Sequence, residues 1–173
     1  DLTRVDKITM PDLEDEYFSS AVIDTVNGYA YFGVGSSYKN IVKIDTDPTR
    51  TFQKIADLYD AGASGGNNLE CAIIDIANNY AYFGSANNAN PGQILRYSIA
   101  PANFSADGIL ITTVGLDLLN TAVIDLNKEF AYLGTTGQAQ VIKVRLSDFK
   151  MVGVLQTSSL VHLASSIIDE NYL

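Results

Sequence analysis

The hydrophobic residues of the chain fall into short runs, and one of these runs recurs. An apolar run ending in aspartate occurs at Ala21–Asp24, Ala72–Asp75, Ala122–Asp125 and Ser166–Asp169. The four aspartates are 51, 50 and 44 residues apart. Repetition at periods of this size is typical of proteins that stack several copies of one structural unit.

A second, aromatic block follows the first three runs. Its copies are Tyr29–Gly33, Tyr80–Gly84 and Phe130–Gly134, and each begins five residues after the aspartate. In the first copy the linker is Thr25–Gly28, which ends in Asn-Gly, a pair that favours tight hairpins. We therefore expect the two blocks to form a β-hairpin in each unit.

Two further strands complete each unit. The third strand alternates in character, as a half-exposed strand does, and the fourth is more divergent. The third is expected at Ile41–Ile44, Ile94–Tyr97 and Val141–Val144, and the fourth at Phe52–Ile55, Ile109–Val114 and Met151–Leu155. No helical period competes, so the predicted fold is all-β, built from four-stranded antiparallel units whose strands we call a, b, c and d.

Strand b carries large side chains on both faces. Tyr29 and Tyr31 point to one side of the strand and Phe32 to the other. A sheet with one face in water would not show this pattern, whereas a blade packed between two neighbouring blades would. The units are therefore interpreted as the blades of a β-propeller.

The repeat also resembles a known family. An apolar strand, an aspartate-containing turn, an aromatic strand ending in glycine and a third strand such as Ile41–Asp45 resemble the repeats of NHL- and YVTN-type β-propellers. The wording AVID…YAYFG…IVKID is similar to tandem repeats of large surface or secreted proteins of microbes and protists, some from extracellular filaments and flagellar hairs. The resemblance covers essentially the whole chain and implies the fold more than a function. Two turns depart from the pattern: Leu126–Glu129 lacks glycine, and Asp169–Tyr172 is shorter.

The repeat predicts about three and a half blades. Residues 1–10 are expected to be the outer strand of a preceding blade, residues 19–60, 70–116 and 120–156 to be blades, and residues 164–173 to begin another. Propellers close with about four to eight blades, so we expect a stretch of a larger, seven-bladed ring. Two copies sharing one ring is the alternative, which fits less well because a c strand would be missing. The 173-residue chain alone is expected to aggregate or oligomerise through its open edges.

Composition narrows the range of partners. The chain carries 20 acidic and 11 basic residues, a formal net charge of −9, and its basic residues are scattered. Nucleic acid and anionic membranes are therefore disfavoured. No apolar run is long enough to span a membrane, and no leader segment is visible, although one could have been removed. Cys71 is the only cysteine, so no internal disulfide is expected.

The recurring aspartates are the first candidate site residues. Recurrence suggests ligands, but aspartate at such a turn more often accepts backbone N–H bonds. Calcium would need several more converging oxygens. The acidic loop Pro11–Glu16 lacks EF-hand spacing and is interpreted as solvated, and Asp45 and Asp47 are expected to serve a proline-containing turn. We expect no metal or cofactor, and a structural role for the turn residues Asp24, Asp75, Asp125 and Asp169.

No catalytic group is expected in this segment. His162 is the only histidine, and Cys71 precedes an apolar strand and is interpreted as a buried thiol. The glycine-rich stretch Ala61–Gly66 lacks the Gly-Lys-Ser/Thr ending of a phosphate-binding loop. No serine, histidine and acid combination with a supporting motif occurs.

Loop variation suggests where a partner would bind. The b–c and d–a loops vary in length and lie at one end of a meander, whereas the a–b turn is constant. Asn103-Phe104-Ser105 is an N-glycosylation sequon in the c–d loop at the opposite end. We expect a protein or glycan ligand on the b–c/d–a face and glycosylation of Asn103 if the protein is secreted.

These inferences favour a non-enzymatic structural or interaction module of a larger extracellular or cell-surface protein or filament assembly. Its partners would be other blades of the same propeller or neighbouring subunits. Two alternatives remain open: a propeller enzyme whose catalytic residues lie in other blades, and a carbohydrate-binding propeller.

Overall fold

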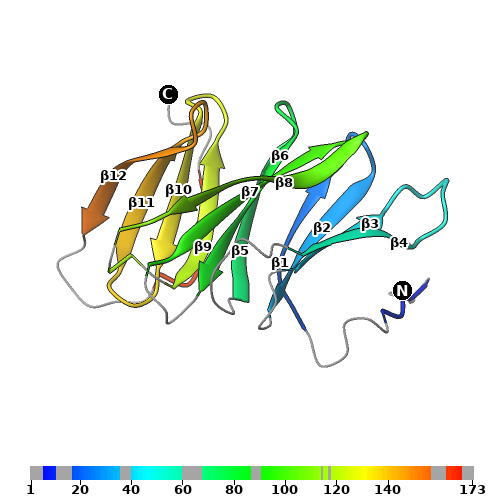
Figure 1. Ribbon diagram of the computed structural model, residues 1–173, viewed down its shortest axis with the longest axis horizontal. Helices are drawn as coiled ribbons and strands as arrows, with labels where there is room; N and C mark the ends of the chain where they lie inside the picture. The colour runs from blue at the N-terminus through cyan, green and yellow to red at the C-terminus, as the bar shows by residue number, and fades with distance from the viewer. Residues whose placement is uncertain are drawn as a thin grey trace.

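The computed structural model describes residues 6–10, 17–35, 40–59, 68–86, 91–113, 115–116, 118–156 and 163–168. These residues form twelve strands and no helix (Figure 1). Within this part of the chain there is accordingly no helix that could cross a membrane.

The strands form three four-stranded antiparallel sheets, each a simple meander of consecutive strands. We call them blades 1, 2 and 3. Blade 1 contains β1 (Tyr17–Asp24), β2 (Tyr29–Gly35), β3 (Asn40–Asp45) and β4 (Lys54–Tyr59). Blade 2 contains β5 (Asn68–Asp75), β6 (Tyr80–Ala86), β7 (Gln93–Ala100) and β8 (Asn103–Ile111). Blade 3 contains β9 (Leu119–Asp125), β10 (Phe130–Thr135), β11 (Gln140–Arg145) and β12 (Lys150–Gln156). The all-β prediction is confirmed; the number of blades in a ring stays a prediction.

The same hairpin opens every blade. The repeated aspartate ends the first strand and pairs with the aromatic residue that starts the second, as in Asp24↔Tyr29. The last residue of the turn has a positive φ in each copy: 71° at Gly28, 58° at Asn79 and 58° at Glu129. Glycine adopts this conformation without strain and asparagine tolerates it, whereas glutamate does so at a cost. The turn of blade 3, which has glutamate at this position, keeps a positive φ as the other two turns do.

Replacing Glu129 by glycine should stabilise the protein. The substitution Glu129→Gly relieves the left-handed conformation at this position, and we expect the free energy of unfolding to rise by about 0.5–1 kcal/mol. Urea unfolding followed by circular dichroism measures this change. The matched substitution is Gly28→Ala, whose added Cβ would lie 2.9 Å from Nη2 of Arg50. That variant should be destabilised, and equal effects of the two substitutions would contradict the explanation.

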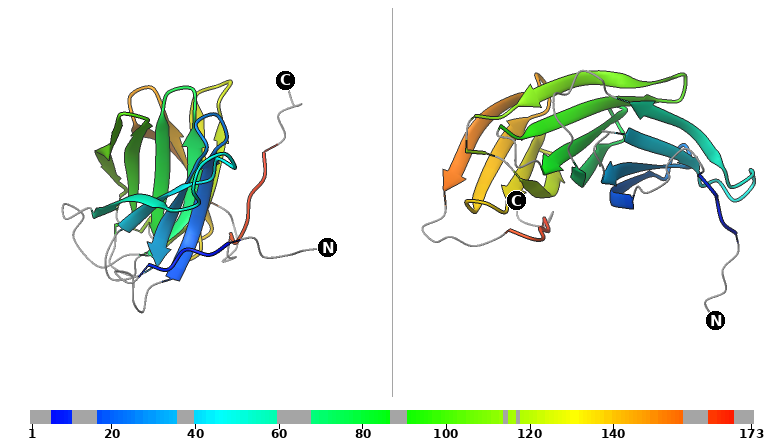
Figure 2. Two further views of the ribbon diagram at one scale, coloured as in Figure 1. Left: turned by 90° about the vertical axis from the view of Figure 1, so that its right-hand side faces the viewer. Right: turned by 60° about the horizontal axis from the view of Figure 1, so that its bottom comes forward.

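The three blades stand side by side in a curved array (Figure 2). One apolar cluster lies between blades 1 and 2 and contains Tyr31, Leu69 and Phe83. A second lies between blades 2 and 3 and contains Tyr82, Leu119 and Leu133. On the outer side of blade 1, Phe32 packs with Val34, Val42 and Ile44, and Ile8 and Met10 cover this cluster. Strand b therefore packs on both faces. This confirms the prediction made from its large side chains on both sides.

The glycine that ends each aromatic block marks the place where neighbouring blades approach most closely. A Cβ built on Gly33 would lie 2.8 Å from the Cβ of Leu69 in blade 2. One built on Gly84 would lie 3.1 Å from the Cβ of Leu119 in blade 3. Gly134 stands in the same relation to Leu163, again at 3.1 Å. Glycine is needed at positions 33 and 84 because the next blade occupies the space of a side chain, and at position 134 because Leu163 does.

The structure differs from the expected strand limits in the fourth strands. In blade 2 the residues expected to form a c–d loop continue the ladder, with Ser98↔Ser105 and Ile99↔Phe104 paired, so that only Pro101 and Ala102 form the turn. In blade 1 the fourth strand starts at Lys54 rather than at Phe52. These strands lie at the outer edge of their sheets, and β8 and β12 contain only exposed or half-buried residues, so buried hydrophobic positions do not mark where they begin and end.

The two terminal segments form no strand where they are described. Residues 6–10 and 163–168 have no regular secondary structure, and the rest of both segments lies outside the described residues. A strand requires a partner for its backbone groups, and the sheets of blades 1 and 3 already contain four strands each.

Candidate functional site

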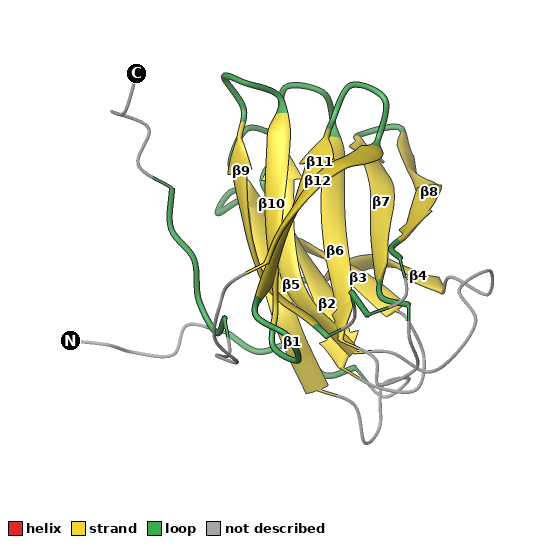
Figure 3. Ribbon diagram, turned by 90° about the vertical axis from the view of Figure 1, so that its left-hand side faces the viewer, coloured by secondary structure: helices red, strands yellow, loops and turns green. Residues whose placement is uncertain are grey.

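The short turns of all three blades gather at one end of the array, which we call the turn end (Figure 3). It contains the a–b turns, residues 25–28, 76–79 and 126–129, and the c–d turns, residues 46–53, 101–102 and 146–149. The described candidates from the sequence, Asp24, Asp75, Asp125 and Asn103, all lie here. Asp169, His162, Pro11–Glu16 and Ala61–Gly66 lie outside the described residues.

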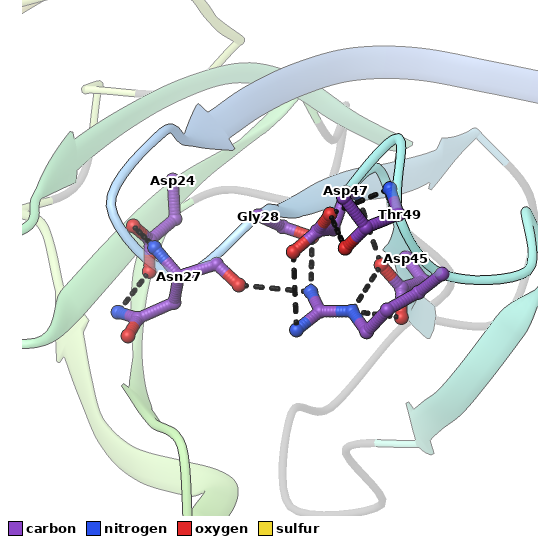
Figure 4. Close-up of polar contacts among 7 residues, drawn as sticks. Asp24, Asn27, Gly28, Asp45, Asp47 and Thr49 are labelled. Carbon is purple, nitrogen blue, oxygen red and sulfur yellow. Dashed lines mark hydrogen bonds and ion pairs between the residues drawn. The ribbon is translucent and has the colours of Figure 1, made fainter.

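Asp24 is fully buried and its carboxylate closes the first turn (Figure 4). Its Oδ1 accepts hydrogen bonds from the backbone N–H groups of Val26 and Asn27, at 3.0 and 2.9 Å. Its Oδ2 accepts a bond from the Asn27 side-chain amide at 2.7 Å. Both oxygens are therefore occupied by the turn itself, which is the ordinary role of aspartate before a tight turn.

The other two turns repeat this arrangement with variations. Asp75 accepts bonds from the backbone N–H and the side-chain amide of Asn78, at 3.1 and 2.8 Å. Asp125 accepts the N–H of Lys128 at 3.0 Å, and the Lys128 ammonium lies 3.5 Å from its Oδ2. The carboxylates are separate, each in its own blade, so they do not converge on a shared ligand.

Removing the Asp24 carboxylate should cost stability. The variant Asp24→Ala leaves the N–H groups of Val26 and Asn27 without their acceptor in a buried place, and we expect a loss of about 1–3 kcal/mol in the free energy of unfolding. Chemical denaturation at neutral pH provides the measurement. The control is Asp57→Ala, which removes an exposed carboxylate that pairs with Lys54 and should cost under about 1 kcal/mol. A similar loss in both variants would contradict this role of Asp24.

In blade 1 an arginine links the two turns. Arg50 Nε lies 2.8 Å from Oδ2 of the buried Asp45, and Arg50 Nη2 donates to the carbonyl oxygens of Asn27 and Gly28 at 3.0 and 3.2 Å (Figure 4). Asp47 accepts the N–H and the hydroxyl of Thr49. Asp45 and Asp47 thus serve the proline-containing turn.

A stacked cation that the sequence analysis did not identify lies on the third strand of every blade. The Lys43 ammonium lies 3.8 Å from the ring centre of Tyr29 and 5.7 Å from that of Phe104 in blade 2. The Arg96 guanidinium lies 4.7 Å from Tyr80 and 4.6 Å from Phe149 in blade 3. Lys43 and Arg96 are thus held between aromatic rings of two blades, a favourable arrangement for a partly desolvated charge, whereas Lys143 lies over Phe130 and Tyr132 of its own blade.

Burial governs the ionisation of these groups. It lowers the pKa of the Lys43 ammonium, although the carboxylates of Asp24 and Asp45 oppose the shift. Burial raises the pKa of the Tyr82 hydroxyl to about 12, and the nearby Arg96 opposes that rise. At neutral pH Tyr82 therefore stays protonated.

A hollow of about 560 Å³ lies at the turn end between blades 2 and 3. Its lining combines the rings of Tyr80 and Tyr82, the guanidinium of Arg96 and the carboxylates of Asp75 and Glu129. The mixture of both charges with aromatic faces suits a neutral polar group or a peptide better than a free anion or cation.

Acidic and cysteine side chains are the remaining candidate groups in the part of the chain that is described. No three acidic, histidine or cysteine side chains there could hold a metal ion together. Cys71 is buried between blades 2 and 3, and burial raises the pKa of its thiol to about 12. A thiol in this state is a poor nucleophile at neutral pH.

Asn103 is exposed at the turn end, where it is the first residue of β8. The middle residue of its sequon, Phe104, packs against Tyr31 with ring centres 5.6 Å apart. The opposite end carries the b–c and d–a loops, most of which lie outside the described residues. The expected ligand face there stays a prediction.

Comparison with known proteins supports the fold. No protein-family model matches the sequence, and no curated protein sequence matches it. A chain in the crystal structure of the nidogen/laminin complex, which contains a β-propeller, aligns with a TM-score of 0.59 at 16% identity, over 84% of this chain and 49% of that one. A protein from Lactobacillus plantarum aligns with a TM-score of 0.40 at 12% identity, over 90% of this chain and 57% of that one. The chain thus spans about half the length of the first of these structures, and its three four-stranded blades have a β-propeller-like fold.

Proposed function

We propose that this chain is a non-catalytic interaction module of a larger extracellular or cell-surface protein or filament assembly. The observation that carries the proposal is how the repeated polar side chains are used. Asp24 and Asp75 bond to their own turns, and Lys43 and Arg96 stack between blades. The repeated polar side chains thus close turns and pack one blade against the next, which leaves the variable loops for recognition.

The structural comparison supports this proposal at the level of fold. The nidogen/laminin structure is a complex of two proteins and contains a β-propeller, so a fold of this kind occurs in a protein–protein assembly. The more specific kinship with NHL- and YVTN-type repeats rests on the resemblance of the sequence alone.

Site-specific photocrosslinking tests whether the chain binds a partner and whether that partner binds at the end that carries the b–c and d–a loops. A photoreactive residue is placed at Gln138, which is exposed in the described b–c loop of blade 3, or at Leu126, which is exposed at the turn end. Each protein is irradiated in the surface or secreted fraction of the producing cells, and crosslinked partners are identified by mass spectrometry and rebound in purified form. We expect a reproducible partner from position 138.

Position 126 is the matched control, because both residues are exposed and lie at opposite ends of the same blade. A partner captured from position 126 alone would place recognition at the turn end. Capture from neither position, or turnover of a substrate by the purified chain, would refute the interaction module.

Secretion is tested through Asn103. Because its side chain is exposed on a short hairpin, we expect an oligosaccharyltransferase to reach it in a secreted chain. Native material should lose mass on treatment with an N-glycosidase, with Asn103 converted to aspartate. An unmodified Asn103 in native material would remove this support for an extracellular location.

A further inference from the structure

The hollow at the turn end has one wall in blade 2 and the other in blade 3. Its volume of about 560 Å³ lies within the range of about 300–1,000 Å³ that ligand sites occupy. Blade 2 supplies the rings of Tyr80 and Tyr82 and the exposed Asn78, and blade 3 supplies the exposed Leu126 and Glu129. The hollow is thus a product of one junction within the chain.

Glu129 is the residue by which the blade 3 turn departs from the other two turns. The equivalent positions hold Gly28 and Asn79, which adopt a positive φ more readily than glutamate does. Glu129 nevertheless has a φ of 58°, and it lines the hollow. Strained backbone positions cluster at ligand-binding sites, so a ligand in the hollow would give this glutamate a role.

The carboxylate of Glu129 is available to a ligand, whereas that of Asp75 is not. Both oxygens of Asp75 accept hydrogen bonds from Asn78, at 3.1 and 2.8 Å. The backbone carbonyl oxygen of Glu129 accepts the N–H of Leu146 at 2.9 Å, but among the described residues no hydrogen bond or ion pair engages its carboxylate. A ligand that enters the hollow therefore meets a free carboxylate.

Arg96 is the cation in the described lining of the hollow, and it is already engaged. Its Nε donates to Oδ2 of Asp107 at 2.6 Å, and its guanidinium lies 4.7 Å from the ring centre of Tyr80. Because Asp107 neutralises Arg96, the negative charge of the two lining carboxylates remains. The hollow therefore favours a cationic group over an anionic one.

The other cations close to the hollow are each paired with a carboxylate. Lys128 lies 3.5 Å from Asp125. Arg145 and Lys150 lie 2.8 and 3.7 Å from Asp148. None of these residues belongs to the described lining, so they leave the free carboxylate of the hollow without a partner.

We propose that this hollow binds a peptide segment that carries a lysine or an arginine, with the basic side chain paired to the carboxylate of Glu129. The methylene groups of such a side chain pack on apolar surface while its charged end stays in a polar environment. Leu126, which is 48% exposed, and the ring of Tyr80 supply that surface, and the exposed Ser147 adds a hydroxyl for the peptide backbone. The net charge of −9 attracts a basic segment over a longer range.

This inference rests on the proposed interaction function, because it adds a second site and a class of partner to the same module. The hollow lies at the opposite end of the blades from the b–c and d–a loops. In the photocrosslinking experiment, a partner held in the hollow is therefore captured from position 126, which lines it, and a partner held by the loops from position 138.

Nuclear magnetic resonance titration of the purified, ¹⁵N-labelled chain tests the proposal. The probes are end-blocked hexapeptides Gly-Ser-Leu-Xaa-Ser-Gly in which Xaa is Lys, Arg, Gln or Glu. We expect the Lys and Arg peptides to shift the amide resonances of residues 77–78 and 126–129, with a dissociation constant below about 1 mM. The Gln and Glu peptides should bind at least about tenfold more weakly, and added salt should weaken the binding of the Lys peptide.

Three results would overturn the proposal. The first is a Glu peptide that binds as tightly as the Lys peptide. The second is the absence of shifts at residues 77–78 and 126–129 with every peptide. The third is tighter binding of the neutral oligosaccharide cellohexaose at the same residues, which would make the hollow a carbohydrate site.

Variants of Glu129 separate a ligand-binding role from a structural one. Glu129→Gln removes the charge at nearly constant size and should weaken binding of the Lys peptide by about three- to fivefold. Glu129→Lys should weaken it by more than about tenfold, because like charges then meet. Glu129→Gly should weaken binding as Glu129→Gln does although it stabilises the fold, which a purely structural role would not produce.

The control is Asp57→Lys, which makes the same change of charge at an exposed carboxylate of blade 1 and should bind the Lys peptide as the unmodified chain does. Unchanged binding by Glu129→Lys, or an equal loss in both lysine variants, would refute the role of Glu129. The site and the proposed function fail separately: a chain that binds no basic peptide but captures a protein from position 138 keeps the function and loses this site.

Discussion

Replacing Phe83 by alanine should lower the free energy of unfolding by about 3–5 kcal/mol. Phe83 is fully buried between blades 1 and 2, where its ring meets Tyr97 edge-on with centres 6.0 Å apart and packs beside Gly33. The substitution opens a cavity in a junction formed by two sheets, which cannot collapse without moving a blade. Denaturant unfolding monitored by circular dichroism gives the change.

The matched control is Phe52→Ala, the same substitution at a side chain that is 43% exposed. It should cost under about 1 kcal/mol. If Phe83→Ala were as mild as Phe52→Ala, the cluster between blades 1 and 2 would not be a principal source of stability.

Adding a single methyl group at Gly33 should also destabilise the protein strongly. The Cβ of Gly33→Ala would lie 2.5 Å from the Ser20 hydroxyl, 2.8 Å from the Leu69 Cβ and 3.0 Å from the Phe83 ring. A hydroxyl can rotate away, but the Leu69 Cβ belongs to a packed strand of blade 2, so the blades must separate. We expect a loss of about 1–3 kcal/mol, the usual cost of overpacking.

Gly153→Ala is the control for this substitution, because the nearest atom to its added Cβ is 3.8 Å away. Alanine there should be neutral or slightly stabilising, since it restricts the unfolded chain. Both variants can be compared by thermal unfolding. Equal stability of the two would show that Gly33 does not set the distance between blades 1 and 2.

The sequence predicted the feature that Phe83→Ala examines more fully than the feature that Gly33→Ala examines. The aromatic blocks predicted a blade packed on both faces, and Tyr31 and Phe32 do pack on opposite sides of β2. The glycine at the end of each block was visible as a repeat, but its reason was not. That reason is a leucine about 35 residues further along the chain, and contacts at such a distance depend on how the sheets stack.

In the candidate site, too, some features were predicted from the sequence and others were seen only in the structure. The recurrence of Asp24, Asp75 and Asp125 before short turns predicted hydrogen bonds to nearby backbone, because the donors lie two or three residues away. The stacking of Lys43 and Arg96 was not predicted, although Lys43, Arg96 and Lys143 recur in register, because the rings that complete each stack belong to the next blade. Asn103 was placed in a loop and proved to begin β8.

The sequence by itself determined what depends on neighbours along the chain: the repeat, the order of four strands, the hairpin turns and the aspartates that accept hydrogen bonds within them. Local hydrogen bonds and side-chain alternation act over a few residues, so a repeated pattern is enough to reveal them. Only the tertiary structure decided which faces meet, why Gly33 and Gly84 must lack side chains, and that Phe104 and Phe149 complete the stacks over Lys43 and Arg96. Those features arise from packing between sheets, where residues about 50 positions apart occupy the same few ångströms.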